Sequence, residues 1–500
     1  MENLMLLIDN VNTIPGVENC SKSKSYFRQW VVSASFSLVI MLIGMSHGHT
    51  AILLQQINPI SPQQTNLSTT MTSKGIRIEN GEIFNRPELV IESKDMQSWI
   101  ASVLVLFNSP SCWILAAIGK SIGRKPVLIA STTMFTVAWF VIVFADNACD
   151  LMVSRSAMSL STGILAGLTS IYQGECSSPK VRPIFNAMQG ISFSLGILSC
   201  HAVGVWYHWR TTALFCGLVA VIALGMCCIL PESPVWLLHR GRFVDAIHSW
   251  TFLRGNREFD ELESMYVDVQ EEWTSQEKID GKKPMWIKQF FSSTFLKPCG
   301  IIMALFTVLQ LSGVGAVTFY CITMITEIVG ESDAYKATLI LDVLRLLSSI
   351  VLTLCMRVYS ARMLTLCSAF SCSVFLIGLS LSIVFEIWRP YFSLVLLFSY
   401  EVSVIMGLTS LPWNFLSEFF SPDHKEIGVG LSTSYYYILF FVVVKSNFKL
   451  ISLLQIWGTF LLFGCITACG TVVLYKILPD TKNKSLKEIE LMFTNHGHRK

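Results

Sequence analysis

The sequence is poor in charge. Only 14% of its 500 residues are Asp, Glu, Lys or Arg, whereas a soluble domain usually carries about 25%. A chain of this length with so few charges cannot cover a water-facing surface in the ordinary way, which argues against a soluble enzyme. The net charge of +3 is also small, so the totals supply no field strong enough to bind nucleic acid.

The sequence also lacks motifs for chemical catalysis. It contains no phosphate-binding loop, no nucleophile elbow and no Cys or His spacing typical of a zinc site. Its 15 cysteines are scattered, many of them in apolar stretches, where a thiol behaves as a small apolar side chain. We therefore expect neither an enzyme nor a protein that uses a metal or a cofactor.

What the sequence has instead is long apolar runs. Hydrophobic residues make up 52% of the chain, and the mean hydropathy is +0.54. A helix needs about 17–25 largely apolar residues to cross a bilayer, and we find twelve such runs. They cover residues 29–54, 98–118, 127–145, 151–173, 186–206, 211–230, 299–322, 335–356, 363–386, 391–416, 428–447 and 452–476. We predict an all-α membrane protein with twelve transmembrane helices.

Basic residues predict the orientation of these helices, because cytoplasmic connections carry an excess of Lys and Arg. Such residues precede the first run and fill the second connection: Lys22, Lys24, Arg28, Lys120, Arg124 and Lys125. The N-terminus is therefore expected inside, and an even number of crossings returns the C-terminus to the same side. With no cleavable signal pattern at its start, the chain is predicted to be a multi-pass plasma-membrane protein.

The first long connection, residues 55–97, is then outside the cell. It contains Asn66-Leu67-Ser68, which is an acceptor sequence for an N-linked glycan in that compartment. We predict a glycoprotein modified at Asn66.

One polar stretch divides the chain into two sets of six runs. Such a layout suggests the major facilitator arrangement, in which the substrate path lies between two bundles. The predicted parts are a cytoplasmic tail (1–28), an N-terminal bundle (29–230), a cytoplasmic helical linker (231–298), a C-terminal bundle (299–476) and a cytoplasmic tail (477–500).

A short pattern occurs at equivalent places in both halves. Glu175 precedes Arg182 by seven residues after the fourth run, and Glu418 precedes Lys425 by seven after the tenth, each with Ser-Pro between. Such charges can form a network that holds an inner gate shut and opens as the halves rock apart. The alternative is a set of solvated turn charges, each pair worth about 0–1 kcal/mol.

Several longer strings carry a family resemblance. They are Pro231-Glu232-Ser233-Pro234 after the sixth run, Gln310-Leu311-Ser312-Gly313 in the seventh, Leu411-Pro412-Trp413 in the tenth, and Leu478-Pro479-Asp480-Thr481-Lys482 in the tail. Together they resemble the sugar porter family of major facilitators, and most of all the facilitated trehalose transporters of insects. The resemblance covers about residues 28–495, and it adds Glu232 to the expected cytoplasmic charge network.

The same resemblance suggests where a sugar would bind. Trp413 offers an aromatic face for a sugar ring, Gln310 offers a donor and an acceptor to hydroxyls, and Ser312 keeps the seventh helix thin where it must bend. Each also has a plainer interpretation: packing for Trp413, a helix–helix contact for Gln310 and a simple kink at Pro412.

Other positions depart from the family pattern. In the second connection Gly123-Arg124-Lys125 survives, but its counterpart in the eighth connection retains only Arg362. Part of the inner charge network is therefore missing. The charge-network residues that remain in these two connections are Arg124, Lys125 and Arg362.

Amides expected near a sugar are also replaced. Gly315 occupies the place of a family asparagine, Gln189 stands one residue away from a family glutamine, and Arg345 occupies an amide position on the eighth helix. An unpaired buried polar group costs about 1–3 kcal/mol, so a sugar site needs several such partners. Gln310, Ser312, Trp413, Arg345 and Gln189 are the candidate substrate-binding residues.

Arg345 and Asp342 are unusual inside an apolar run, because an ionised group in a membrane helix usually faces a partner or a cavity. Their spacing of three places both on one helical face. One interpretation is a self-neutralised ion pair. The other is that Arg345 lies in the central cavity, where it binds an anionic group or blocks the path.

The leading hypothesis is a facilitative sugar transporter of the trehalose or glucose class, working by alternating access as a uniporter. Its partners are the sugar and the lipid bilayer, not nucleic acid, and we expect a monomer. Two alternatives remain: a transporter-like receptor or sensor that no longer conducts, and a carrier of an anionic solute.

Overall fold

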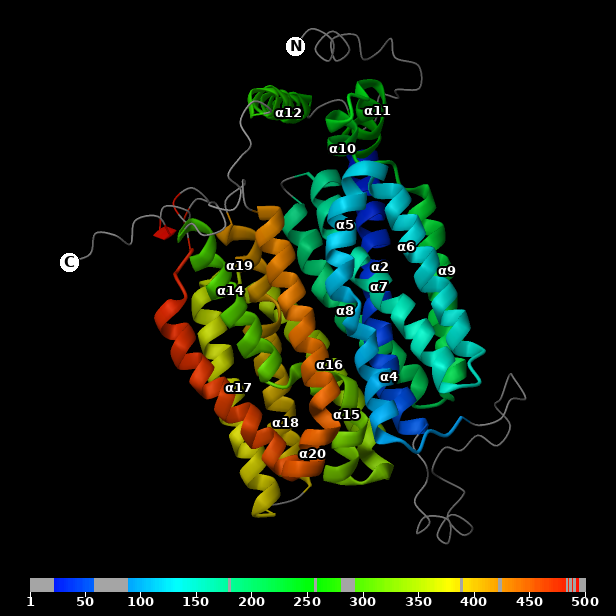
Figure 1. Ribbon diagram of the computed structural model, residues 1–500, viewed down its shortest axis with the longest axis vertical. Helices are drawn as coiled ribbons and strands as arrows, with labels where there is room; N and C mark the ends of the chain where they lie inside the picture. The colour runs from blue at the N-terminus through cyan, green and yellow to red at the C-terminus, as the bar shows by residue number, and fades with distance from the viewer. Residues whose placement is uncertain are drawn as a thin grey trace, which may run out of the picture.

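The computed structural model describes residues 22–57, 89–178, 181–255, 259–279, 293–386, 390–420 and 425–482, together with 484, 488, 492 and 493. Within these residues the chain forms helices and no β-strand. Figure 1 shows two bundles side by side, with a short group of linker helices at one end. We call this end of the molecule the linker end and the opposite one the distal end.

The N-terminal bundle contains six membrane crossings. They are built from α2 (Lys22–Gln56), α4 (Lys94–Leu106), α5 (Asn108–Ile122), α6 (Arg124–Val143), α7 (Ala148–Cys176), α8 (Arg182–Gly204) and α9 (Trp209–Ile229). The linker helices are α10 (Pro234–His239), α11 (Phe243–Arg254) and α12 (Phe259–Ile279).

The C-terminal bundle contains the other six crossings. They comprise α14 (Ser293–Leu311), α15 (Val314–Val329), α16 (Glu331–Cys355), α17 (Ala361–Val384), α18 (Tyr391–Val404), the π-helix η2 (Ile405–Thr409), α19 (Leu411–Phe419) and α20 (Lys425–Ile477).

The prediction of an all-α membrane protein is confirmed. Ten helical segments in the described part of the chain are long and apolar enough to cross a membrane. Helix α8 adds another crossing, and its hydropathy is reduced by polar residues such as Asn186, Gln189 and His201. Helix α20 is two crossings that meet at Gln455, where φ is 58° and ψ is 176°. The structure thus has twelve crossings. The connection between the last two lies at Gln455, a few residues beyond the expected 448–451.

Two crossings of the C-terminal bundle, the seventh and the tenth, are interrupted within the membrane. The seventh breaks between α14 and α15, where Gly313 has a φ of 83° that L side chains rarely adopt. The tenth passes through η2 before α19 begins with Pro412 in its first turn. Proline cannot donate to the preceding turn, which favours a new helix start at this point.

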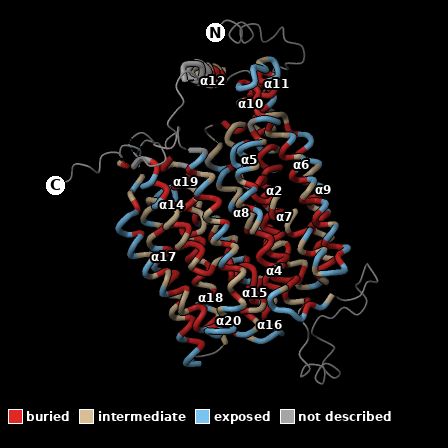
Figure 2. Tube along the Cα trace, in the orientation of Figure 1, coloured by how far each residue is buried: buried red, intermediate tan, exposed pale blue. Residues whose placement is uncertain are grey.

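The exterior of the bundle is apolar and the interior is densely packed. Large hydrophobic side chains point outward on many helices, for example Val153, Ile229 and Phe370. Figure 2 shows buried residues running through the centre of both bundles. A protein that exposes this much apolar surface needs lipid around it, because water would not solvate it favourably.

The linker helices belong structurally to the N-terminal bundle. Trp250 packs in a small apolar core with residues of α10 and α12. The Leu253 carbonyl accepts hydrogen bonds from Ser25 (2.8 Å) and Gln29 (3.2 Å) of α2. Arg254 donates to the Ser177 carbonyl at the end of α7 (2.7 Å). A rigid-body movement of the N-terminal bundle should therefore carry α10 and α11 with it.

Candidate functional site

Four ionisable side chains meet at the interface between the bundles. His201 comes from α8, Asp342 and Arg345 from α16, and Glu401 from α18; none has more than 5% of its side chain exposed. We call these four residues the interface charge cluster. Burial of so many charges is costly in a membrane bundle unless they neutralise one another.

Arg345 is neutralised mainly from another helix. Its Nη2 lies 2.6 Å from Oε1 of Glu401, and its Nε donates to the same oxygen at 2.8 Å. Asp342 is a more distant partner, with 3.6 Å between its Oδ1 and Nη1 of Arg345. Nη2 of Arg345 also donates a hydrogen bond to the Thr318 hydroxyl at 3.3 Å. Arg345 thus joins α16 to α18 and α15.

His201 reaches from the N-terminal bundle to the C-terminal one. Its Nδ1 is 2.5 Å from Oδ2 of Asp342, and its Nε2 is 3.0 Å from the Gly48 carbonyl oxygen on α2. Sequence reasoning singled out Asp342 and Arg345 but missed His201 and Glu401. The signal was available, because both are ionisable residues within predicted apolar runs.

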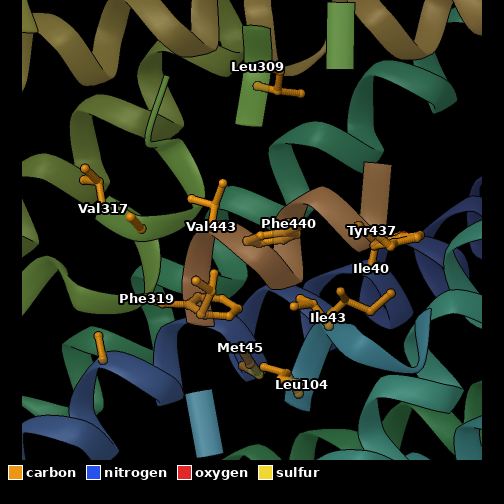
Figure 3. Close-up of a cluster of buried hydrophobic side chains, with 14 of the residues drawn as sticks. Ile40, Ile43, Met45, Leu104, Leu309, Val317, Phe319, Tyr437, Phe440 and Val443 are labelled. Atoms are coloured by element: carbon orange, nitrogen blue, oxygen red, sulfur yellow. The ribbon is translucent and has the colours of Figure 1, made fainter. Parts of the chain in front are cut away.

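Aromatic side chains fill the space beside this cluster. Phe440 of α20 packs against Phe319 of α15, with ring centroids 5.4 Å apart. His47 of α2 lies 5.1 Å from Phe319 and 5.3 Å from Phe193 of α8. Figure 3 shows Phe319 and Phe440 close to Ile43 and Met45 of α2, so this apolar contact also spans the two bundles.

Gly315, where the resemblance leads us to expect asparagine, lies against the ring of Phe440. A Cβ added at Gly315 would lie 2.4 Å from the Phe440 ring and 3.3 Å from Oε1 of Gln310. The ring of Phe440 therefore occupies space that a side chain at position 315 would need. An aromatic contact thus stands where the resemblance leads us to expect an amide.

Gln310 and Trp413 lie in one neighbourhood of the C-terminal bundle. Trp413 packs with Phe306 and Tyr436, at centroid distances of 5.2 Å and 5.0 Å. The Gln310 amide lies against the Tyr436 hydroxyl. Gln310 is 1% exposed, and its Oε1 has no hydrogen-bond partner in the structure. A buried acceptor without a partner is suited to receive a hydrogen bond from a ligand hydroxyl.

Ser312 and Gln189 lie in different settings. The Ser312 hydroxyl donates to the Leu309 carbonyl (2.7 Å), and its own carbonyl accepts from Tyr400 (3.0 Å). Gln189 donates to Oε1 of Gln173 (2.9 Å) and accepts from Ser170 (3.2 Å). Ser312 is therefore placed at the helix break, and Gln189 in a polar group of the N-terminal bundle.

Some of the residues named for the charge network meet at the linker end of the N-terminal bundle. Arg124 forms a bidentate ion pair with Glu175: its Nη2 donates to Oε1 at 3.0 Å and its Nε donates to Oε2 at 3.3 Å. Glu232 accepts from the backbone N–H groups of Arg124 (3.0 Å) and Lys125 (3.2 Å). These two N–H groups belong to the first turn of α6. The Glu232 carboxylate therefore accepts from donors that have no partner within the helix itself.

The remaining network residues have other partners. Arg182 donates to the Ser177 carbonyl (3.1 Å) rather than to Glu175, and Arg362 donates to the Tyr475 carbonyl (3.0 Å). Burial raises the pKa of the Glu418 carboxyl, and a hydrogen bond with Thr481 opposes that rise. The side chain of Lys425 lies outside the described residues, as does Asn66.

The Glu232 contact makes a testable prediction. Glu232→Ala should lower the free energy of unfolding by about 1 kcal/mol, because the first N–H groups of α6 lose their acceptor. Thermal unfolding of the detergent-purified protein measures this, with Glu92→Ala as the control, since Glu92 is exposed and lies outside the helices. Equal melting temperatures for the two variants would show that the contact contributes no stability.

Polar contacts join the two bundles toward the distal end. Lys445 of α20 lies 2.6 Å from Asp95 and 4.3 Å above the Trp99 ring, both at the start of α4. Ser98 donates to the Lys445 carbonyl at 2.7 Å, and Thr323 donates to Gln55 at 3.3 Å. With the His201–Asp342 contact, these bonds hold the bundles together on the distal side.

Comparison with known proteins agrees with this architecture. The family described as "Sugar (and other) transporter" matches residues 31–493. The facilitated trehalose transporter Tret1 of Apis mellifera ligustica is 26% identical over 80% of this chain and 80% of its own length. Tret1 of Culex quinquefasciatus is 24% identical over 96% and 88%.

Solved structures share the fold. The proton:xylose symporter XylE bound to 6-bromo-6-deoxy-D-glucose superposes with a TM-score of 0.71 at 14% identity, over 94% of this chain and 100% of that one. The inward-open conformation of XylE from E. coli also gives 0.71, at 15% identity over 93% and 99%. The fold is that of a major facilitator, and the chain is a member of the sugar transporter family, a membrane transporter rather than an enzyme.

Proposed function

We propose that this protein moves a neutral sugar of the trehalose or glucose class across the membrane by facilitated diffusion. The observation that carries the proposal is the unpartnered Oε1 of Gln310 beside the aromatic group of Trp413, Phe306 and Tyr436. An aromatic face stacks on the apolar side of a sugar ring, while the amide exchanges hydrogen bonds with its hydroxyls.

The remaining candidate residues have supporting roles in this proposal. Gln189 adds amide chemistry from the N-terminal bundle, and Ser312 allows the seventh crossing to bend beside the sugar. Arg345 holds α16 against α18 and contributes to the site through the position of those helices. Its charge is already neutralised by Glu401 at 2.6 Å.

In the proposed mechanism, contacts between the bundles at the distal end break and re-form as the protein alternates between two states. The distal contacts of Asp95 with Lys445 and of Gln55 with Thr323 must break before a sugar can pass on that side. At the linker end, Arg124, Lys125, Glu175 and Glu232 brace the N-terminal bundle as one body, with Arg182, Arg362, Glu418 and Lys425 as the other proposed network residues. Rocking of the two bodies about the central site then exposes it to each side in turn.

We also propose the placement of the protein in the cell. A plasma-membrane location with both termini and the linker end in the cytoplasm agrees with the basic residues of the second connection. The distal end then faces outward, with a glycan at Asn66, and the transporter works as a monomer.

A specific observation favours one alternative. The Phe440 ring fills the space beside Gly315 and Gln310, as expected of a sensor that binds sugar without conducting it. A carrier of anions has no such support, because Arg345 contacts two carboxylates and leaves no net positive charge for a substrate.

Uptake of radiolabelled trehalose and glucose into oocytes tests the proposal. The parent should show saturable uptake, and Gln310→Ala should raise KM about tenfold because a substrate hydroxyl loses its acceptor. Trp206→Ala is the control, since Trp206 is exposed at the distal end. Surface labelling corrects for expression.

The possible outcomes separate the alternatives. Sugar binding without uptake by the surface-expressed parent would replace the transporter with the sensor. Uptake of an organic anion but of neither sugar would replace it with the anion carrier.

A further inference from the structure

The two contacts of the His201 ring call for more hydrogen-bond donors than His201 and Asp342 have in their ordinary neutral-pH forms. Nδ1 of His201 faces a carboxylate oxygen at 2.5 Å, and Nε2 faces the Gly48 carbonyl oxygen at 3.0 Å. Both neighbours are acceptors. A neutral imidazole has one N–H and an ionised carboxylate has none, so together they can satisfy only one of these two contacts.

One additional proton resolves this shortage. It makes the imidazole doubly protonated, or it sits on Asp342 and is donated to Nδ1 while Nε2–H donates to Gly48. Both descriptions place the same single proton on the pair. Without it, a lone pair of the imidazole would face an oxygen in the buried interface, which is repulsive.

The charge count of the cluster leads to the same number. Asp342 and Glu401 carry two negative charges, and Arg345 carries one positive charge. With a neutral His201 the cluster has a net charge of −1, whereas the additional proton makes it neutral. Within these four residues the additional proton balances the charge; the buried cation Arg155 of α7 lies outside this count.

Other ionisable groups around His201 do not supply this proton. From α2, His49 bonds to the Trp209 carbonyl and His47 to the Ile43 carbonyl. From α7, Arg155 donates to Thr50 and to the Ile100 carbonyl. From α9, the Cys216 thiol lies 3.9 Å from Cys200. From α16, Arg345 approaches Oδ1 of Asp342, whereas the imidazole contacts Oδ2.

The contact also crosses between the two bodies that alternating access must separate. His201 belongs to α8 of the N-terminal bundle and Asp342 to α16 of the C-terminal one, and His201 is one turn from the distal end of its helix. Distal opening would part the two residues and admit water to them. Water can then replace the shared hydrogen bond, so the additional proton is no longer required.

We propose that His201 and Asp342 form a binding site for one proton, which is taken up when the bundles close at the distal end and released when they open there. This inference rests on the alternating-access part of the proposed function. Acid then stabilises the distal-closed state and base favours the distal-open state. The ligand is the proton itself, so pH acts directly on the conformational equilibrium.

Single-molecule FRET on the full chain in lipid nanodiscs tests this without any sugar. Dyes on unnatural residues at Tyr207 and Phe385, which are exposed on opposite bundles, report distal opening. For the parent, the open-to-closed ratio should rise with pH by up to about tenfold per pH unit, the slope for release of one proton.

Variants assign the proton to this pair. Asp342→Asn supplies a permanent N–H donor to His201. This variant should therefore stay in the distal-closed state, and its open-to-closed ratio should not depend on pH. His201→Gln removes the titrating ring and should also abolish the dependence, which keeps the test decisive if one variant does not fold. His49→Gln is the matched control, because this equally buried ring contacts one carbonyl, and it should follow the parent.

The results are separable from those of the uptake assay. A parent ratio that does not change with pH overturns the proton site, and so does a pH slope that persists in both Asp342→Asn and His201→Gln. A pH slope lost in those variants supports the site even where neither trehalose nor glucose is taken up, in which case the proposed substrate fails and the proton site stands.

Discussion

Replacing Arg345 by methionine should lower the free energy of unfolding by about 3–5 kcal/mol, the usual cost of removing one partner from a buried ion pair. Glu401 would keep its negative charge at 0% exposure and lose the cation 2.6 Å away. Its second oxygen, Oε2, already has no hydrogen-bond partner. The uncompensated carboxylate, rather than the lost attraction alone, is the source of the large effect.

A second substitution should restore most of this loss. Arg345→Met combined with Glu401→Gln removes both charges, and a neutral pair of similar volume is often as stable as the ion pair. Chemical and thermal unfolding of the purified variants would measure the coupling. Arg362→Met serves as the control, because Arg362 donates to a carbonyl on the exposed surface. If the double variant were as unstable as the single one, the account based on charge burial would be wrong.

Adding one methyl group at Gly44 should destabilise the N-terminal bundle by about 1–3 kcal/mol through overpacking. The added Cβ would lie 2.1 Å from the Phe193 carbonyl oxygen of α8. A Cβ added at Gly196 of α8 would likewise lie 2.1 Å from the Met41 carbonyl oxygen of α2. The two helix backbones touch here, so neither can move aside by rotating a side chain.

Gly225→Ala is the matched comparison for Gly44→Ala. Gly225 lies in α9, and a Cβ there would meet no atom within 4 Å. Alanine is the better helix former, so this variant should be neutral or slightly stabilising. Melting temperatures of both variants in the same detergent test the contrast. A Gly44→Ala protein that melts with or above Gly225→Ala would show that α2 and α8 are not in backbone contact.

The close packing of α2 against α8 also positions His201. A Cβ at Gly48 would lie 3.1 Å from the Ile197 carbonyl, so α2 runs close beside α8 along this stretch. This closeness brings the Gly48 carbonyl to His201 at 3.0 Å. Small residues on one helix thus position an acceptor for an ionisable residue on another, which then reaches across to Asp342.

The departures from the family pattern can be interpreted with the structure in view. Arg345 takes an amide position, and Glu401 lies opposite it to neutralise it. Gly315 stands where the resemblance leads us to expect asparagine, and the Phe440 ring occupies the space that a side chain there would need. In both places a residue on a neighbouring helix fits the unexpected one, so the interior is packed and the charge of Arg345 is balanced.

How much of this could be predicted from the sequence depends on the range of the interactions. Membrane spans are a local property, because backbone hydrogen bonds within one helix and apolar side chains along it suffice to cross a bilayer. Hence the twelve crossings and the all-α class could be predicted, and the strings around Glu232 and Pro412 pointed to the family that the comparison then showed.

The partners within the site could not be predicted in this way. Spacing alone placed Asp342 next to Arg345 on one helix face, but the nearer carboxylate is Glu401, 56 residues away. Glu175 contacts Arg124 of α6, which lies 51 residues away in the sequence, rather than Arg182. Charges on different helices have no fixed sequence separation, so their pairing follows from how the helices pack.

The amino-acid sequence by itself determined which segments enter the membrane and where polar residues interrupt them, since these follow from local hydropathy and backbone hydrogen bonding. Only the tertiary structure decided that Arg345 is neutralised by Glu401, that Phe440 occupies the space beside Gly315, and that His201 meets Asp342 across the two bundles. Such contacts depend on the distance between helices far apart in the chain, which close packing of small residues sets.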